Sequence, residues 1–431
     1  MSILIKNATI LTQNKKREKV KGNIYIEDNN IVQISKKPIS LEADYVLEGK
    51  KKLVLPGFIN THTHVPMTLL RGYGDDMVLN KWLEERIWPV EAKLDNKSVE
   101  IGTKLGLLEM IASGTTTFLD MYFFEDTIGK VAEKVGMRTF LGFALIDSGT
   151  PEYSSEKLIS KCEQFIRRWK NRDINIIQPL IAPHSTYTCN PETLEKSLEL
   201  ADKYNVLLHS HCSETRDEVY TVQKKYGLRP VELLKKYGLL CDKMVLAHCG
   251  WITKNEIADI KRGGVKISHC PVSNMKIATG GYAPVPEMLD SNVVVGLGTD
   301  GAASNNTLDM FDTMKFCALL HKQHRWDPQI LPAQTVFDLA TIGGARCLNI
   351  QENVGSIEEG KNADIIMIDL NKPHLTPSHD FVSHLIYAAT GSDVCTTIVD
   401  GKPLMIDNNF LTVDYQKTLE DAEKYAMELT N

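Results

Sequence analysis

An apolar run of the sequence ends in two histidines at GFINTHTH, residues 57–64. On a β-strand, side chains two residues apart project from the same face, so His62 and His64 would present two imidazoles side by side. Imidazole is the commonest protein ligand for zinc and similar divalent ions. Two ordinary surface histidines would look the same, so the rest of the chain has to decide whether this pair is a metal site.

Eight short apolar runs follow one another along the chain, with amphipathic segments such as 98–112, 155–169, 191–204 and 218–237 between them. Alternating strands and helices of this number predict a (β/α)₈ barrel, in which active sites lie where the strands end. A doubly wound open sheet is the alternative, but it would bind its ligand at a single switch point. The eight runs are residues 58–64, 115–121, 139–146, 175–184, 206–211, 244–248, 265–269 and 293–300.

Both ends of the chain are rich in strand signals. Residues 1–55 contain only β-patterned runs, with a polar hairpin turn at 28–30, and strand patterns return at 363–369 and 396–399. We therefore expect residues 1–55 and 351–431 to build one small β-sandwich beside a catalytic barrel of residues 56–350, with a helix at the C-terminus. The stretch GSIEEGK, 355–361, lacks the spacing and the strand-to-helix context of a phosphate-binding loop and predicts a turn.

The charge balance indicates a small-molecule partner. Forty-nine basic and 55 acidic residues give a net charge of −6 without long like-charge runs, so we expect neither nucleic acid nor a membrane as a partner. The nine cysteines form no Cys-x-x-Cys pair, and we find no signal peptide and no apolar run of about 20 residues. These features predict a cytoplasmic protein.

Histidines gather where the predicted strands end. Seven of the 12 do so, and the eighth run ends in an acid within GLGTDG, residues 296–301; the histidines are His62, His64, His184, His209, His211, His248 and His269. A catalytic divalent site needs three or four nitrogen and oxygen ligands and one open position. We predict that the ligands are His62, His64, His211 and Asp300. This mixed donor set favours zinc, with iron or manganese as alternatives, over magnesium.

His209 and His211 project from the same face, so strand geometry alone does not choose between them. We prefer His211 as the ligand because it is nearer the strand end and Glu214 follows three residues later. His209 and His269 are then expected either to support the metal ligands from behind or to pack in the core. The run 175–184 contains no lysine of the kind that bridges two ions, which favours one metal, and His184 remains a possible substrate contact.

Glu214 is the candidate proton shuttle, because a carboxylate beside a metal-activated water can take a proton and later deliver it to the substrate. His248 and Asp300 are candidates for orienting that water. Each residue also has an ordinary structural interpretation: a histidine at a strand end is often only hydrogen-bonded, and Glu214 could be the N-terminal acid of the next helix.

Six motifs spread over nearly the whole chain resemble the amidohydrolase superfamily, in its adenine-and-related deaminase branch. They are PGFINTHTH (56–64), GTTT (114–117), HCSET (211–215), HCPVSN (269–274), GTDG (298–301) and GSIEEGK (355–361). The resemblance implies a composite β-sandwich, a metal-containing barrel and hydrolytic chemistry.

Two further stretches, RGYGDD (71–76) and KWLEERIWPVE (81–91), resemble the 5′-methylthioadenosine/S-adenosylhomocysteine and 5′-deoxyadenosine deaminases. This closer resemblance implies hydrolytic removal of the 6-amino group of a 5′-modified adenosine. It implies that Trp82 lines the nucleoside, that Glu91 accepts hydrogen bonds from the ribose hydroxyls and that His184 contacts the purine or ribose. Glu214 would protonate N1 of the purine. Family habit suggests a homodimer or homotetramer.

One departure concerns the 5′ group. Relatives that take S-adenosylhomocysteine can place arginines near the end of the third barrel strand to hold its carboxylate, but residues 140–153 contain none and offer apolar Phe143 instead. We therefore expect short uncharged 5′ groups to be preferred. The alternatives are a deaminase or dechlorinase of another heterocycle, such as guanine or a triazine, and a non-catalytic assembly module, which would typically have lost metal ligands.

Overall fold

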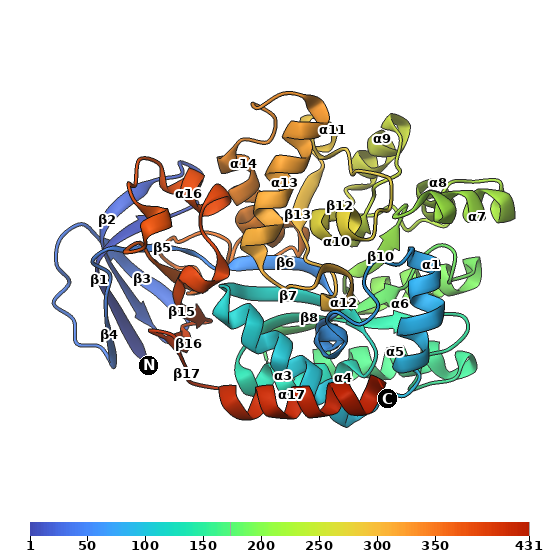
Figure 1. Cartoon of the computed structure of the whole chain (residues 1–431), viewed down its shortest axis with the longest axis horizontal. Helices are drawn as coiled ribbons and strands as arrows, with labels where there is room; N and C mark the ends of the chain where they lie inside the picture. Colours follow the sequence, from blue (N-terminus) through green and yellow to red (C-terminus); the bar gives the residue numbers. More distant parts are fainter. Residues whose placement is uncertain (173, 431) are drawn as a thin grey trace.

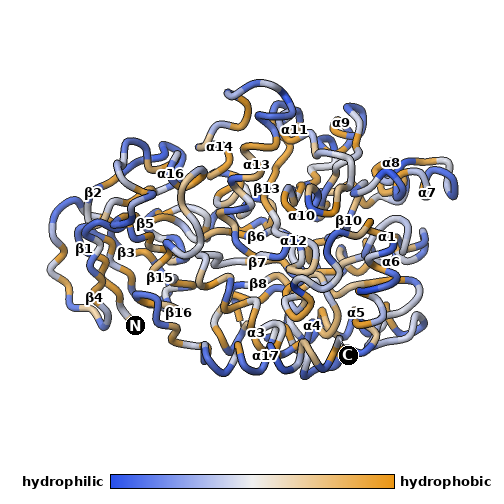
Figure 2. The backbone as a smooth tube through the Cα atoms, viewed as in Figure 1, coloured by the Kyte–Doolittle hydropathy of each residue, from blue (hydrophilic) through white to orange (hydrophobic). Residues whose placement is uncertain are grey.

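The computed structural model describes residues 1–172 and 174–430. It contains a closed barrel of eight parallel strands and a nine-stranded sheet built from both ends of the chain, which lies at one end of the molecule (Figure 1). The predicted fold class, a (β/α)₈ barrel with a small β-sandwich from both termini, is confirmed. Hydrophilic stretches lie mostly along the outer loops and helix surfaces (Figure 2).

All eight predicted runs form barrel strands, and the barrel closes where β13 pairs with β6. The strands are almost entirely buried, as expected for a parallel barrel covered by helices. The eighth strand ends at Leu297, before the predicted end at Asp300, because the chain has left the extended conformation there. The strands are β6 (Phe58–Thr63), β7 (Thr115–Tyr122), β8 (Arg138–Leu145), β9 (Ile177–Pro183), β10 (Leu208–Cys212), β11 (Met244–His248), β12 (Lys266–His269) and β13 (Val294–Leu297).

Helices surround the barrel. The predicted helix 218–237 is wrong as a single element, because Gly227 ends α7 with a positive φ of 69° and Pro230 starts α8. The helices are α3 (Asn96–Ala112), α4 (Glu125–Val135), α5 (Ser155–Lys170), α6 (Pro191–Tyr204), α7 (Arg216–Tyr226), α8 (Pro230–Lys236), α9 (Lys254–Gly263), α10 (Pro271–Lys276), α11 (Val285–Asp290), α12 (Ala302–Asn305), α13 (Met310–Arg325), α14 (Ala333–Asp338) and α15 (Gly344–Cys347).

The segment between β6 and β7 crosses the mouth of the barrel. It consists of short helical pieces: η1 (Val65–Leu70), α1 (Leu79–Trp82), the π-helix η2 (Leu83–Ile87) and α2 (Trp88–Glu91). A second π-helix, η3 (Leu339–Gly343), joins α14 to α15. Trp82 and Glu91 are buried, so this segment turns two of its large side chains inward rather than toward solvent.

The terminal sheet has the strand order β17-β16-β15-β14-β5-β1-β2-β3, with β4 paired to β1. It encloses its own apolar core, which includes Ile3, Ile24 and Ile365. Its strands are β1 (Ser2–Leu11), β2 (Lys19–Glu27), β3 (Asn30–Ser35), β4 (Tyr45–Glu48), β5 (Lys52–Pro56), β14 (Ile365–Asp369), β15 (Val394–Val399), β16 (Lys402–Ile406) and β17 (Asn409–Phe410).

The sheet is tied to the barrel by a buried ion pair and by helices. Arg138, at the start of β8, donates two hydrogen bonds to Asp364 and one to Asp400, at 2.9–3.0 Å. Beyond the sheet strands, η4 (Pro373–Leu375), α16 (Phe381–Tyr387) and η5 (Gly391–Asp393) precede α17 (Tyr415–Thr430), which lies along α3 (Figure 1). Among the described residues, no helix is long and apolar enough to cross a bilayer.

Candidate active site

His62, on β6, has its ring orientation fixed by a chain of hydrogen bonds. The Nδ1 atom of His209 lies 2.9 Å from the carbonyl oxygen of Val245, and its Nε2 atom lies 2.8 Å from Nδ1 of His62. A carbonyl oxygen only accepts, so His209 donates from Nδ1 and accepts at Nε2 the N–H of His62. The Nε2 atom of His62 therefore carries a bare lone pair, and this buried atom has no hydrogen-bond partner among the described residues.

His64 and His211 are oriented in the same way. The Nδ1 atom of His64 lies 2.6 Å from the carbonyl oxygen of Met121, and that of His211 lies 2.8 Å from the carbonyl oxygen of His184. Both rings therefore donate from Nδ1, and their Nε2 atoms face each other at 3.4 Å. Proteins usually orient a metal-binding imidazole in this way, with the N–H of its second ring nitrogen donating a hydrogen bond to a carbonyl oxygen.

Asp300 completes the group from the end of the eighth strand. Its Oδ1 atom lies 3.4 Å from Nε2 of His62 and 3.2 Å from Nε2 of His64, and a backbone φ of 64° turns the residue toward them. Its carboxylate accepts hydrogen bonds from the Gly301 N–H at 2.8 Å and the Ser273 hydroxyl at 2.6 Å.

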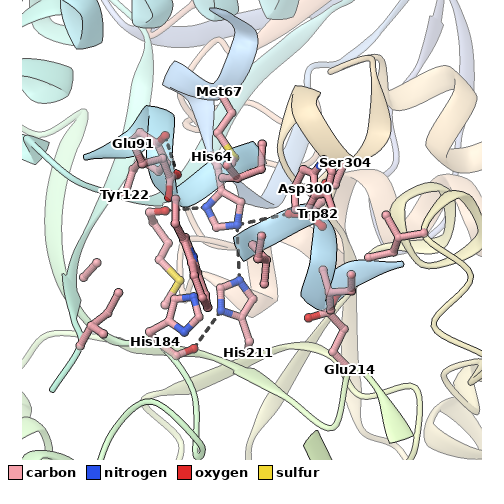
Figure 3. A pocket seen from close by; sticks show the side chains of 18 of the residues that line it. His64, Met67, Trp82, Glu91, Tyr122, His184, His211, Glu214, Asp300 and Ser304 are labelled. Atoms are coloured by element: carbon pink, nitrogen blue, oxygen red, sulfur yellow. Dashed lines mark hydrogen bonds and ion pairs between the residues drawn. The ribbon is translucent and has the colours of Figure 1, made fainter. Parts of the chain in front are cut away.

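Three separations among the predicted donors suit a divalent ion. Two ligands about 2.0–2.1 Å from a tetrahedral ion lie about 3.3 Å apart, which matches the 3.2–3.4 Å between His62 and Asp300, His64 and Asp300, and His64 and His211. Three bare imidazole nitrogens and one carboxylate are also the donor chemistry that zinc and iron accept. Figure 3 shows His64 between Asp300 and His211.

His248 ends β11 with a positive φ of 69°. Its Nδ1 atom lies 2.9 Å from Oδ1 of Asn274, and its Nε2 atom lies 3.9 Å from the carboxylate of Glu214. It also belongs to a group with His62 and His211 whose ligand atoms all lie within 4.8 Å of one another. His248 is therefore close enough either to reach an ion directly or to face a water beside it.

Glu214 stands in the loop after β10 and lines the cavity. The backbone N–H groups of Ser213 and Glu214 donate to the Glu218 carboxylate at 3.0 and 2.7 Å, which fixes the loop. Thr215 is the N-cap of α7, and Asp217 and Glu218 are the acids of its first turn. Glu214 therefore lies outside the helix, contrary to the alternative that it is a first-turn acid, and burial raises its pKa.

A cavity of about 790 Å³, its open mouth included, lies above these residues. Its lining combines apolar and aromatic side chains with a few polar groups, which is typical of a site for a small organic ligand. The predicted substrate contacts Trp82, Glu91 and His184 all line it, together with Glu214 and Asp300. In Figure 3, Glu91 and Tyr122 lie on one side of His64 and Glu214 on the other.

The polar substrate contacts have partners of their own. Glu91 accepts a hydrogen bond from the Tyr122 hydroxyl at 2.8 Å, and burial raises its pKa. The Nδ1 atom of His184 lies 3.0 Å from the Thr188 hydroxyl, and burial lowers the pKa of this ring to about 3, so it is neutral at pH 7. Sequence reasoning did not identify Tyr122, Ser273, Asn274 or Glu218. Ser273 and Asn274 lie inside the HCPVSN motif, which was the one available signal.

Two histidines were expected to play supporting parts. His209 accepts a hydrogen bond from His62, as described above, and His269 turns away from the barrel interior.

A sequence model of the amidohydrolase family matches residues 53–404. The chain belongs to the amidohydrolase family.

This amidohydrolase resembles named relatives over nearly its whole length. It is 46% identical to the 5-methylthioadenosine/S-adenosylhomocysteine deaminase of Thermococcus onnurineus, covering 94% of this chain and 95% of that protein. It is 44% identical to the 5′-deoxyadenosine deaminase of Methanosarcina mazei, covering 99% and 98%. Its structure matches an adenosine deaminase from Xanthomonas campestris with bound zinc, with a TM-score of 0.95, 33% identity and coverage of 99% and 98%. These matches confirm the predicted family and make the protein a hydrolase that uses a divalent metal ion.

Proposed function

We propose that this amidohydrolase removes the 6-amino group of 5′-modified adenosines by hydrolysis, giving the inosine analogue and ammonia. The observation that carries the proposal is that Glu214 and His248 line the same cavity as the metal donors His64, His211 and Asp300, with the carboxylate of Glu91 in its wall. The names of the relatives, deaminases of 5′-deoxyadenosine and 5-methylthioadenosine, support the same reaction.

We assign one ion to His62, His64, His211 and Asp300, and we propose that it is zinc, as in the deaminase from Xanthomonas campestris. When bound, such an ion lowers the pKa of a water ligand toward neutrality and polarises it for attack. The negative charge of Asp300 balances part of the ion's charge in this buried site.

The surrounding residues move the protons. Because Nδ1 of His248 donates to Asn274, its Nε2 is free to accept a hydrogen bond from the water that attacks C6 of the purine. Glu214 takes a proton from that water and passes it to N1 as the C6–O bond forms. Glu214 then takes the remaining proton of the added oxygen and delivers it to the amino group, so that the C6–N bond breaks, ammonia leaves and the C6 carbonyl forms.

Glu91 is proposed to hold the ribose, because a carboxylate can accept hydrogen bonds from two neighbouring hydroxyls. Glu91→Gln is expected to raise KM for nucleosides about 10–100-fold with little change in kcat, since hydrogen bonds to a charged group contribute about 1.5–3 kcal/mol. Steady-state kinetics on 5′-deoxyadenosine would measure this. Glu85→Gln, which changes an exposed carboxylate of the same segment, is the matched control. An unchanged KM would remove Glu91 from ribose binding.

The lining of the cavity supports a preference for uncharged 5′ groups. No arginine or lysine is among the described residues that line it, and β8 and the residue just after it contribute Ala144 and Ile146. The sequence analysis had named Phe143 as the apolar residue that residues 140–153 offer instead of an arginine. That residue instead packs behind the strand against Tyr153 and Phe165, with ring centroids 6.1 and 5.4 Å apart. A substrate carboxylate placed against this wall of the cavity would therefore have no cationic side chain to pair with.

The test of the proposed function is kcat/KM on 5′-deoxyadenosine, 5′-methylthioadenosine, S-adenosylhomocysteine, adenosine and adenine, followed by loss of the adenine absorbance. We expect the two uncharged 5′-modified nucleosides to be preferred. Ile146→Arg should raise the ratio of S-adenosylhomocysteine to 5′-deoxyadenosine activity about 10–100-fold, because it adds a charge-assisted bond to the carboxylate. Ile146→Met, similar in reach but uncharged, should leave the ratio near that of the wild type.

The same panel separates the rival functions. A deaminase or dechlorinase of guanine or triazines would act on none of the five substrates. The structural match to the atrazine chlorohydrolase of Arthrobacter aurescens, at 24% identity and a TM-score of 0.91, shows only a shared fold. A non-catalytic module would purify without metal and turn over nothing.

Three expectations from the sequence stay predictions. We propose a homodimer or homotetramer, a reducing cytoplasmic location in keeping with nine unpaired cysteines, and domain boundaries near residues 55 and 350. Mass measurement in solution, fractionation of cells and limited proteolysis would test them in turn.

A further inference from the structure

A second cluster of metal-binding side chains lies outside the barrel interior. It consists of His269 at the end of β12 and Cys317 and His321 on α13, the helix drawn in orange in Figure 1. His269 turns outward to α13, where its ring faces that of His321. The cluster is thus separated from the catalytic donors by the wall of the barrel.

The spacing in this cluster matches that at the catalytic site. The Nε2 atoms of His269 and His321 are 3.3 Å apart, compared with 3.4 Å between those of His64 and His211. Two nitrogen ligands of a tetrahedral zinc ion are expected to lie about 3.3 Å apart. The Cys317 Sγ atom lies within 4.8 Å of the histidine atoms. Closing to the roughly 3.6 Å expected between nitrogen and sulfur ligands needs at most a movement of little more than about 1 Å.

The hydrogen bonding of the cluster leaves the tautomers of both rings open. If the two rings share one N–H between their Nε2 atoms, one ring carries its proton on Nδ1. The Nδ1 atoms of both rings are buried and have no hydrogen-bond partner among the described residues. No carbonyl or carboxylate in this part of the chain therefore fixes either tautomer, and both rings can turn a lone pair toward a shared ion.

The charge state of the cluster is also suitable. Burial lowers the pKa of both rings, that of His321 to about 4, so neither carries a proton that would repel a cation at neutral pH. Burial raises the pKa of the Cys317 thiol to about 12, so an ion that binds as its thiolate complex releases one proton. Two imidazoles and one thiolate form the donor set that zinc and other borderline or soft ions select, rather than magnesium or calcium.

We propose that His269, Cys317 and His321 bind a second, zinc-like ion that ties α13 to β12. A solvent-accessible cavity lined by His269, Tyr282 and His324 gives an ion a route to the cluster and a water for its fourth position. The second nitrogen of each ring lacks the acceptor that the catalytic histidines have, and such acceptors are worth about 10–100-fold in metal affinity. The second ion therefore binds more weakly than the catalytic one and is the first to be removed by a chelator.

Cobalt(II) titration of the metal-free full-length protein tests the proposal. The catalytic donors contain no sulfur, so of the two sites only the second can give the near-ultraviolet thiolate-to-cobalt charge-transfer band. We expect two cobalt ions per chain, with deaminase activity restored by the first and the thiolate band appearing with the second. Saturation at one ion, or a second ion without the band, would overturn the proposal.

Cys317→Ala should bind one ion per chain, show no thiolate band and keep its activity on 5′-deoxyadenosine. Cys241→Ala is the matched control, because Cys241 is the only one of the nine cysteines that is not fully buried and is the thiol most open to adventitious binding. It should keep both ions and the band. A band that survives in Cys317→Ala or disappears in Cys241→Ala would contradict the assignment. The wild-type titration decides the matter even if Cys317→Ala does not fold.

Discussion

Glu214→Gln is expected to lower kcat about 10²–10⁴-fold while metal and nucleoside still bind, because general acid–base catalysis contributes rate of that order. The amide keeps the size of the side chain and its place above the donor group but can neither take a proton from water nor give one to N1. Burial raises the pKa of the native carboxyl, which makes proton transfer to the purine easier than it would be from an exposed glutamate. The loop itself should not move, since Glu218 holds it through backbone N–H groups.

Three measurements make this result interpretable. Metal content should remain at the wild-type value, the affinity for the inosine product should change little, and kcat alone should fall. Glu199→Gln removes an exposed carboxylate on α6 and should behave as the wild type. A Glu214→Gln enzyme that retains a rate within tenfold of the wild type would remove this residue from the proton transfers.

The barrel could be predicted from the sequence because two strong local signals agree along the whole chain. Apolar runs alternate with amphipathic segments, and histidines stand where several of those runs end. The break between α7 and α8 was also visible, since Gly227 and Pro230 are ordinary helix-ending and helix-starting residues. Overlooking these two residues, rather than a tertiary effect, accounts for the wrong prediction of one helix.

The periodicity of the strand could not decide whether His209 or His211 is the metal ligand. Both project from one face of β10, and only the position of the neighbouring strands brings His209 to Nδ1 of His62 and His211 to Nε2 of His64. Residues that hold the site from other elements were missed for the same reason. Ser273, for example, reaches Asp300 across 27 positions of the chain.

Backbone conformation was the other limit. His248 and Asp300 both adopt positive φ values, which L-residues other than glycine rarely do. Asp and His adopt such values more often than most residues, but the preference is too weak to mark these two positions in the sequence. Strain of about 1–3 kcal/mol at such residues is typical of functional sites, where the surrounding structure holds them in place. The same turns end the strands and aim both side chains at the centre of the site.

Asp300→Asn is expected to lower kcat/KM by about three orders of magnitude or more, because a metal ion contributes several kcal/mol of transition-state stabilisation and depends on its charged ligand. The affinity for the ion should also fall by at least about 10–100-fold, which is what changing a residue that only hydrogen-bonds a ligand costs. Metal content after dialysis should therefore fall as well. Metal analysis and steady-state kinetics on the same preparation would measure both effects.

Ser273→Ala is the matched control for Asp300→Asn, because it removes one hydrogen bond to the carboxylate but keeps the charge. It should retain the ion and lose about tenfold in rate, as expected for one hydrogen bond to a charged group. If Asp300→Asn instead kept both its ion and a rate within tenfold of the wild type, Asp300 would not be a ligand. His248 would then be the candidate fourth donor, since its ligand atom lies within 4.8 Å of those of His62 and His211.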